Sequence, residues 1–329
     1  MQEIINEKNL KSSQHNAAVS FMKNIPELVP LLGLIGVVVF FAITTNGLSV
    51  SAFNIKILIN QIVVLAVIAT GSTFIFTMGS FDISLGSVTC LASVFGALAA
   101  NATGSPAIML IVCVISAVCV SLVNGACIAL FKLPSFIVTL ATLNIMTAGA
   151  SLIIGATNMI TITKDITHLD TIFVKIVVLL AIMVISVFMF KFNKLGRGNK
   201  IIGGNQTVAV QSGISVLKNT MYTFILSGIG IGFGSFLLLA RTGSVSVQTG
   251  SALGFDIIIA IVLGGMPISG GARSKITAAI IGATTITALN NGLVILGGST
   301  GALQAVRGVL FLTVVGLMII RYRDRLLPR

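Results

Sequence analysis

The chain has 329 residues, of which 56% are hydrophobic and 9% charged, and its formal net charge at pH 7 is +12. About a quarter of the residues in soluble domains are charged, so this composition excludes a soluble globular protein and indicates one that crosses a membrane many times. Spans of about 20 residues leave room for roughly ten helices and no large soluble domain, so chemistry that needs a folded cytoplasmic domain must come from another chain.

The positive charge does not indicate nucleic-acid binding, because the basic residues stand at the ends of apolar runs, where they determine topology. The first residues are polar and contain Lys8, Lys11 and Lys23. They show no apolar core of a signal peptide and no small-residue cleavage site, so we expect a cytoplasmic tail followed by an uncleaved span.

Ten apolar runs follow, each close to the length of a span except 254–270, which is short. They predict an all-α polytopic membrane protein with an N-terminal tail at 1–28, a transmembrane domain at 29–320 and a basic C-terminal tail at 321–329. The runs lie at 29–46, 56–77, 84–101, 107–131, 135–154, 172–190, 218–240, 254–270, 276–296 and 302–320.

The distribution of lysine and arginine predicts that both ends of the chain are cytoplasmic. With the N-terminus inside, 15 of the 20 basic residues fall on the inner side. The outer side receives Lys56, Lys164, Lys175 and Arg241, and Arg307 lies within the last run. Spans 2–5 and 7–10 then begin on opposite sides of the membrane, which is the parity of an inverted repeat.

The segment 191–217 is the longest polar interruption after the N-terminal tail. It contains Lys191, Lys194, Arg197 and Lys200 without an acidic residue, and glycines flank a stretch that is long enough for a short helix. We therefore expect a cytoplasmic segment that contains such a helix.

Two acidic residues lie near the starts of predicted spans. Asp82, with Ser84, has two compatible interpretations: it shapes an inner gate or a broken helix beside the transport pathway, or it caps the start of span 3. For Asp256, at the start of span 8, capping is favoured over a place in the pathway.

Span 8 runs into a glycine-rich stretch at 262–274 that contains Pro267. Proline removes a backbone donor and glycine favours non-helical geometry, so a continuous helix is not expected there. The chain has no phosphate-binding loop of the Gly-x-x-x-x-Gly-Lys-Ser/Thr type, so we do not expect it to bind ATP.

Four amides lie inside apolar runs: Asn124, Asn144, Asn290 and Asn291. Hydrogen bonding between helices is the ordinary role of such a residue. As a set, together with Asp82 and Ser84, they are the candidates for polar groups along the route of a hydroxyl-rich solute. The four cysteines, two histidines and eight acids form no catalytic or metal-binding pattern, so we expect neither an enzyme nor a metal site.

Several motifs resemble, in the same order, the permease subunits of ribose-type bacterial ATP-binding-cassette importers. The resemblance extends from about span 2 to span 10, and its motifs lie at 81–87, 133–143, 203–205 with 212–214, 262–265 with 269–271, and 289–293.

This resemblance implies a sugar permease of the bacterial cytoplasmic membrane with a fold like that of type II importers. It implies three partners in addition to the lipid bilayer: a second permease, identical or similar; an extracytoplasmic sugar-binding protein; and a cytoplasmic ATPase that carries the ATP. No nucleic-acid partner is implied. The segment 191–217 would be the coupling loop, with the helix that docks into the ATPase formed or flanked by Gly203, Gly204, Asn205, Gln206 and Gly213.

Two alternatives remain open. One is a permease of the same broad fold for a nucleoside, a furanosyl signal molecule or a branched-chain amino acid. The other is a secondary transporter driven by H⁺ or Na⁺, although such proteins commonly place acidic residues in mid-membrane and here both acids lie near helix ends.

Overall fold

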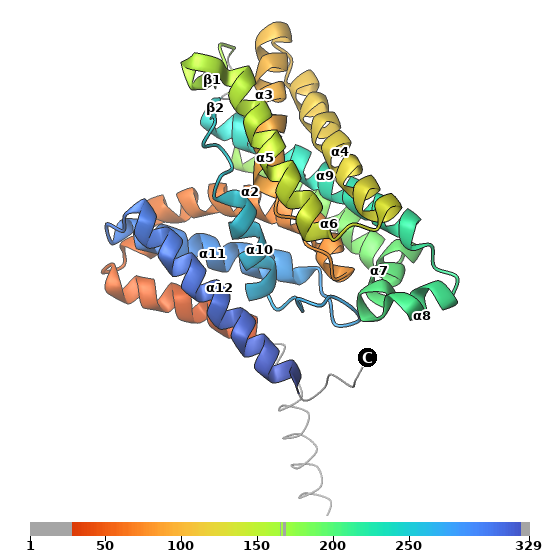
Figure 1. The fold of residues 1–329 in the computed structure, drawn as a ribbon. Helices are drawn as coiled ribbons and strands as arrows, with labels where there is room; N and C mark the ends of the chain where they lie inside the picture. The colour runs from red at the N-terminus through yellow and green to blue at the C-terminus, as the bar shows by residue number, and fades with distance from the viewer. Residues whose placement is uncertain (1–27, 165, 167–168, 324–329) are drawn as a thin grey trace, which may run out of the picture.

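The computed structural model describes residues 28–164, 166 and 169–323. The tail predicted at 1–28 therefore lies outside the described residues except for its last residue, and the tail predicted at 321–329 lies outside them from residue 324 onward. The described chain is a bundle of helices with one small sheet (Figure 1). This confirms the predicted class, a mostly helical polytopic membrane protein.

Each of the ten predicted apolar runs contains one helix. Seven of the described helices are long and apolar enough to cross a membrane, and two further apolar helices are shorter. The first half contains a helix at Leu28–Thr44, the 3-10 turn η1 (Leu48–Val50), α2 (Ala52–Thr77), α3 (Leu85–Thr103), α4 (Pro106–Phe131), α5 (Ser135–Ile154), the 3-10 turn η2 (Gly155–Thr157) and α6 (Ile172–Lys191). The second half contains α7 (Lys194–Gly204), α8 (Gln206–Gln211), α9 (Val216–Thr242), α10 (Leu253–Leu263), α11 (Thr277–Ile295) and α12 (Thr300–Arg323).

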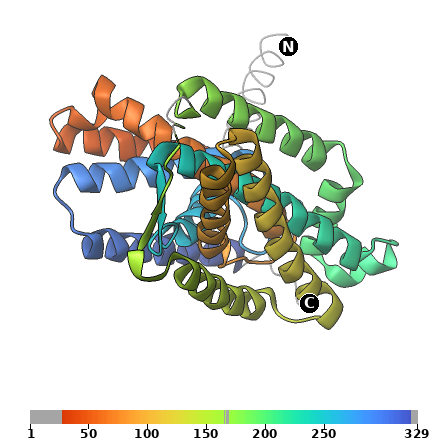
Figure 2. The ribbon, with the colours of Figure 1, turned by 90° about the horizontal axis from the view of Figure 1, so that it is seen from above.

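Helices α3 and α9 form the centre of the bundle. Seen from above, they lie between α6 on one side and α5 on the other (Figure 2). Most residues of α3 and α9 are buried, whereas most residues of α4, α5 and α6 are exposed or only partly buried. In a chain that crosses a membrane, these exposed surfaces suit contact with lipid or with a second membrane protein.

Glycines let α9 pack closely on two neighbours at once. Gly228 and Gly232 face α4, and a Cβ on Gly232 would lie 2.4 Å from an α4 backbone atom. Gly230 and Gly234 face α2, where Gly230 lies against Gly71. Small residues at these positions allow the helix backbones to approach, which is how helices associate without a hydrophobic driving force.

Helix α10 is short, and the predicted interruption of span 8 is confirmed. The helix ends at Leu263, and Gly265 follows with a φ of +94°. The chain then turns around Pro267 and returns to the end of α2, where the Gly271 amide donates to the Thr77 carbonyl at 2.9 Å. The glycine-rich stretch is therefore a tightly packed turn.

A two-stranded antiparallel sheet is the feature of the fold that the sequence analysis did not anticipate. Strand β1 (Met159–Thr161) pairs with β2 (Ser244–Ser246), and Ile160 lies opposite the buried Val245. The sheet joins the segment after α5 to the segment after α9, at the end of the fold away from α7 and α8 (Figure 1). Strands of three residues carry too little periodicity to be recognised in a sequence.

Candidate functional site

The segment 191–217 folds as two helices joined at Asn205. Helix α7 is amphipathic and buries Leu195 and Ile202. Its fully buried Asn199 donates to the Thr223 hydroxyl at 2.7 Å, which attaches the segment to α9. The segment is therefore fixed to the bundle and is not a free loop.

Helix α8 is the short helix expected between the glycines. The Asn205 side chain caps it by accepting from the Thr207 and Val208 amides at 2.9 and 3.2 Å, and Gly213 follows it with a φ of +77°. Most of α8, including Gln206 at its start, is exposed, with Val208 at 48% and Val210 at 60%. An exposed helix with apolar side chains suits contact with another protein.

The two glycines before Asn205 have different surroundings. A Cβ on Gly203 would lie 2.2 Å from the Thr77 carbonyl oxygen and 2.6 Å from the Gly271 nitrogen, whereas a Cβ on Gly204 would meet nothing within 4 Å. Gly203 therefore serves close packing against the end of α2, and Gly204 faces open space.

Basic side chains cover the junction between α6 and α7. The Lys200 ammonium lies over the Phe190 ring, 4.4 Å from its centroid. Partial burial and the nearby charge of Lys191 lower the pKa of Lys200.

Asp82 lies in a buried hydrogen-bond chain between three helices. Its Oδ1 accepts from the Ser84 amide at 2.8 Å and from the Ser84 hydroxyl at 2.6 Å. Asn124 of α4 donates to the Ser84 hydroxyl at 3.1 Å, and Thr142 of α5 donates to Asn124 at 2.5 Å. The Oδ2 of Asp82 is buried without a partner among the described residues.

The surroundings of Asp82 are compatible with both interpretations of its role. It binds a backbone amide at the start of α3, as a cap does, although the N-cap position belongs to Ser84. The loop before α3 is also a broken segment inside the bundle, because two of its amides are satisfied by side chains of α5. Phe81 donates to the Ser135 hydroxyl at 3.1 Å, and Ile83 donates to the Thr139 hydroxyl at 3.2 Å.

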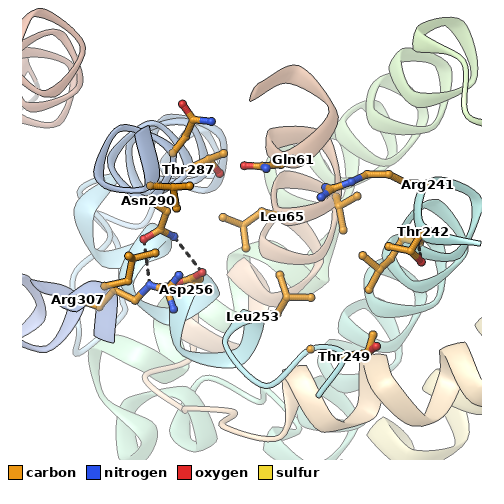
Figure 3. A pocket seen from close by; sticks show the side chains of 16 residues that line it. Gln61, Leu65, Arg241, Thr242, Thr249, Leu253, Asp256, Thr287, Asn290 and Arg307 are labelled. Carbon is orange, nitrogen blue, oxygen red and sulfur yellow. Dashed lines mark hydrogen bonds and ion pairs between the residues drawn. The ribbon is translucent and has the colours of Figure 1, made fainter. Parts of the chain in front are cut away.

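The second polar site is a cavity of about 430 Å³ at the other end of the bundle (Figure 3). It lies between the start of α2, the end of α9, the first turn of α10, the end of α11 and the start of α12. Leu65, Leu253 and Leu303 are among its apolar residues. Its polar lining consists of Gln61, Arg241, Thr242, Thr249, Asp256, Thr287, Asn290, Asn291 and Arg307.

Asp256, Asn290 and Arg307 form a connected group on one wall of this cavity. The Arg307 Nε lies 3.0 Å from Asp256 Oδ1 and donates to Asn290 Oδ1 at 3.0 Å. Asn290 in turn donates to Asp256 Oδ2 at 3.2 Å. The group joins α10, α11 and α12, and Figure 3 marks its contacts.

The expectation that Asp256 caps span 8 is wrong. The N-cap of α10 is Ala252, with no side-chain cap hydrogen bond. Asp256 lies within the first turn instead, and its carboxylate pairs with Arg307.

A second ionic group lies next to Arg241, which lines the cavity. Lys175 is fully buried, pairs with Asp170, and donates to the Asn60 side chain at 2.7 Å. Arg241 reaches the Asn60 carbonyl at 3.5 Å and lies close enough to Asp170 for their charges to interact. These contacts connect the start of α6 with α2 and α9.

The six candidates for a transport route do not gather at one place. Asp82, Ser84 and Asn124 share the buried chain, while Asn290 and Asn291 line the cavity. Asn291 is engaged there with Asn54 through two reciprocal bonds of 2.8 and 3.0 Å. Asn144 lies apart on the exposed side of α5 and donates to the Leu140 carbonyl.

Three residues that line the cavity, Gln61, Thr287 and Arg307, were not predicted from the sequence as site residues. Arg307 carried a usable signal, since an arginine inside an apolar run normally requires a partner. Gln61 and Thr287 could not have been identified in this way, because single uncharged polar residues are common in membrane spans. No group of three His, Cys, Asp or Glu residues that could hold a metal occurs among the described residues.

Comparison with known proteins gives a consistent set of relatives. Residues 54–319 match a family described as "Branched-chain amino acid transport system / permease component". The chain is 32% identical over 304 residues to the ribose import permease protein of Bacillus subtilis, covering 88% of this chain and 91% of that protein. It is 27% identical to the xylose transport system permease protein of Haemophilus influenzae (89% and 96% covered) and 24% identical to the fructose import permease protein of Rhizobium meliloti (90% and 86% covered). No solved structure matches the chain.

Proposed function

Because the chain belongs to the family of permease components of branched-chain amino acid transport systems, and its similar relatives are sugar permeases, we propose that it carries a monosaccharide through the bacterial cytoplasmic membrane as the permease subunit of an ATP-binding-cassette importer. The observation that carries this proposal is similarity to sugar permeases along nearly the whole length of both chains. The family's own description favours a second candidate, a branched-chain amino acid.

ATP hydrolysis takes place on a partner ATPase, which docks on α8. Three features support this: the permease family, the lack of a phosphate-binding loop in the sequence, and the exposed apolar side chains of Val208 and Val210. An extracytoplasmic binding protein delivers the sugar at the opposite end of the bundle. A second permease copy or a similar permease completes the membrane unit, and this chain itself binds no cofactor.

The chain crosses the membrane ten times, with both ends in the cytoplasm. Two features support this topology: ten apolar runs in the sequence, each with one helix, and the excess of basic residues on one side. We expect a membrane-impermeant maleimide to label Lys164→Cys in intact cells, and to label Lys194→Cys only after permeabilisation, in a chain whose four native cysteines are replaced. Labelling of both in intact cells would contradict the topology.

Spans 2–5 and 7–10 form an inverted repeat, in which α2, α3, α4 and α5 correspond to α9, α10, α11 and α12. The contacts of the helices support it. Helix α3 packs against α4, α5 and α9, and α10 packs against their counterparts α11, α12 and α2. Helices α2 and α9 pack on each other, and α3 meets α10 at Gly86 and Gly254, as expected on either side of an axis between the halves.

The polar residues follow the same repeat. The triplet Phe-Asp-Ile occurs at 81–83 and again at 255–257. Each acid is then connected to the next two helices of its half, Asp82 to α4 and α5, and Asp256 to α11 and α12. The residue that provides the contact from the second of these helices is Thr142 in α5 and Arg307 in α12. Each is the eighth residue of its helix.

Reconstitution tests the function. The permease is purified together with its partner ATPase and binding protein and placed in vesicles with ATP. We expect ATP-dependent uptake of D-ribose, D-xylose or D-fructose. Uptake of leucine with none of these sugars would favour the second candidate, and sugar uptake by the permease alone, driven by an ion gradient, would overturn the ATP-driven mechanism.

A further inference from the structure

We infer that the cavity beside Asp256 and Arg307 is a binding site for one neutral monosaccharide inside a single permease subunit, occupied before the sugar reaches the inner half of the bundle. This rests on the proposed function. Neither the family match nor the relatives assign this site. The cavity lies at the helix ends that the predicted topology places on the outer side, so it opens toward the face that receives the sugar.

The size of the cavity fits a small ligand. Its volume of about 430 Å³ lies toward the lower end of the range of roughly 300–1,000 Å³ that is usual for small-molecule sites. Such sites combine apolar walls with a few placed polar groups. Leu65, Leu253 and Leu303 are among the residues that provide apolar surface for the C–H groups of a sugar ring, and nine of the lining residues are polar.

Polar groups without a protein partner point to a ligand in the cavity. Thr284 and Thr285 of α11 donate to carbonyls of the preceding turn, as hydroxyls in helices usually do. Thr287 is only 5% exposed, yet its hydroxyl has no partner within the described part of the chain. The Gln61 amide also has none there, and Figure 3 shows Gln61 and Thr287 facing the cavity from α2 and α11.

The group around Asp256 adds fixed donors and acceptors. Arg307 uses only its Nε in its contacts with Asp256 and Asn290, which leaves its two terminal nitrogens available. Hydroxyl groups donate and accept at once, so a wall that presents guanidinium, carboxylate and amide groups together suits a polyol. The mutual contacts hold these side chains in place before a ligand binds, which lowers the entropy cost of binding.

The charges at the wall formed by Asp256 and Arg307 favour a neutral sugar over an acidic one. Asp256 offsets the charge of Arg307 at a distance of 3.0 Å, so this pair carries no net charge. An anionic sugar would bring a second negative charge close to the Asp256 carboxylate, which is only 6% exposed.

The test is direct binding to the complete permease–ATPase complex in nanodiscs, without the binding protein. The probes are D-ribose, D-xylose and D-fructose, with D-galacturonate as the acidic probe. We expect saturable binding of the sugar that the reconstituted importer transports. Thr287→Val and Gln61→Leu should each weaken it roughly tenfold, the equivalent of one hydrogen bond.

Thr284→Val is the matched control, because its hydroxyl lies in the same helix and is bonded to the Ile280 carbonyl. It should leave sugar affinity unchanged, and thermal unfolding should show that all three variants fold. The inference is overturned if the importer transports a sugar that the complex does not bind, if Thr287→Val and Gln61→Leu bind it as tightly as the native chain, or if D-galacturonate binds more tightly. An importer that transports none of the sugars refutes the proposed function itself, and the site with it.

Discussion

Gly203 and Gly204 are adjacent, but substitution with alanine should affect them very differently. A Cβ on Gly203 would lie 2.2 Å from the Thr77 carbonyl oxygen, well inside van der Waals contact, whereas a Cβ on Gly204 would point into open space. The same one-methyl change therefore tests packing of α7 against α2 at one position and serves as a control at the next.

The magnitude follows from two opposing effects. Overpacking of this kind costs about 1–3 kcal/mol, and displacing Thr77 also weakens its 2.9 Å bond from the Gly271 amide, which adds about 1 kcal/mol. Both variants gain up to about 1 kcal/mol of helix propensity, because both residues lie in α7. We therefore expect Gly203→Ala to be less stable than Gly204→Ala by about 2–4 kcal/mol.

Thermal unfolding of the purified permease measures this difference. Samples are heated to a series of temperatures, and size-exclusion chromatography then determines the fraction that remains folded. At roughly 2–4 °C per kcal/mol for a chain of more than 150 residues, the Tm of Gly203→Ala should lie at least 4 °C below that of Gly204→Ala. Equal values for the two variants would refute the close approach of α7 to the end of α2.

Three further predictions concern coupling and the buried polar groups. Gly204→Phe should abolish sugar uptake while ATP hydrolysis and membrane insertion persist, and unchanged uptake in vesicles would contradict docking at this position. Asp82→Asn should lower uptake or reduce stability by about 1–2 kcal/mol, because it weakens two hydrogen bonds to a buried carboxylate; if it does neither, Asp82 is dispensable. Asn54→Ala and Asn291→Ala, measured singly and together, should show a coupling energy of at least about 1 kcal/mol, since the two side-chain amides exchange two hydrogen bonds with each other. Additive losses would contradict that pairing, and Asn144→Ala, on an exposed surface, should cost little.

The helices could be predicted because hydropathy is a local property. Each span is visible in the sequence as an apolar run, and the end of α10 is predicted by the glycines and Pro267 that follow it. The short helix α8 was likewise visible as a polar stretch between glycines. The sheet of β1 and β2 was not, because its two strands come from segments more than 80 residues apart and only their adjacency creates it.

The polar contacts were harder to predict, since they depend on which helix faces meet. Asp256 looked like a cap because it stands near a helix start, and its true partner, Arg307, belongs to a helix that follows much later in the chain. The amides were identified as a set, but the direction of each side chain separates them into a buried chain, a cavity wall and an exposed surface. An arginine in a span and an acid near one could have been paired on energetic grounds alone.

The position of α9 has a consequence for the synthesis of the protein. Helices α2 and α4 both pack on α9, but α9 is the seventh apolar helix to leave the ribosome. Until it inserts, the surfaces of α2 and α4 that receive Gly230 and Gly232 lack this packing partner. The central packing of the bundle therefore forms only when the second half of the chain inserts beside the first.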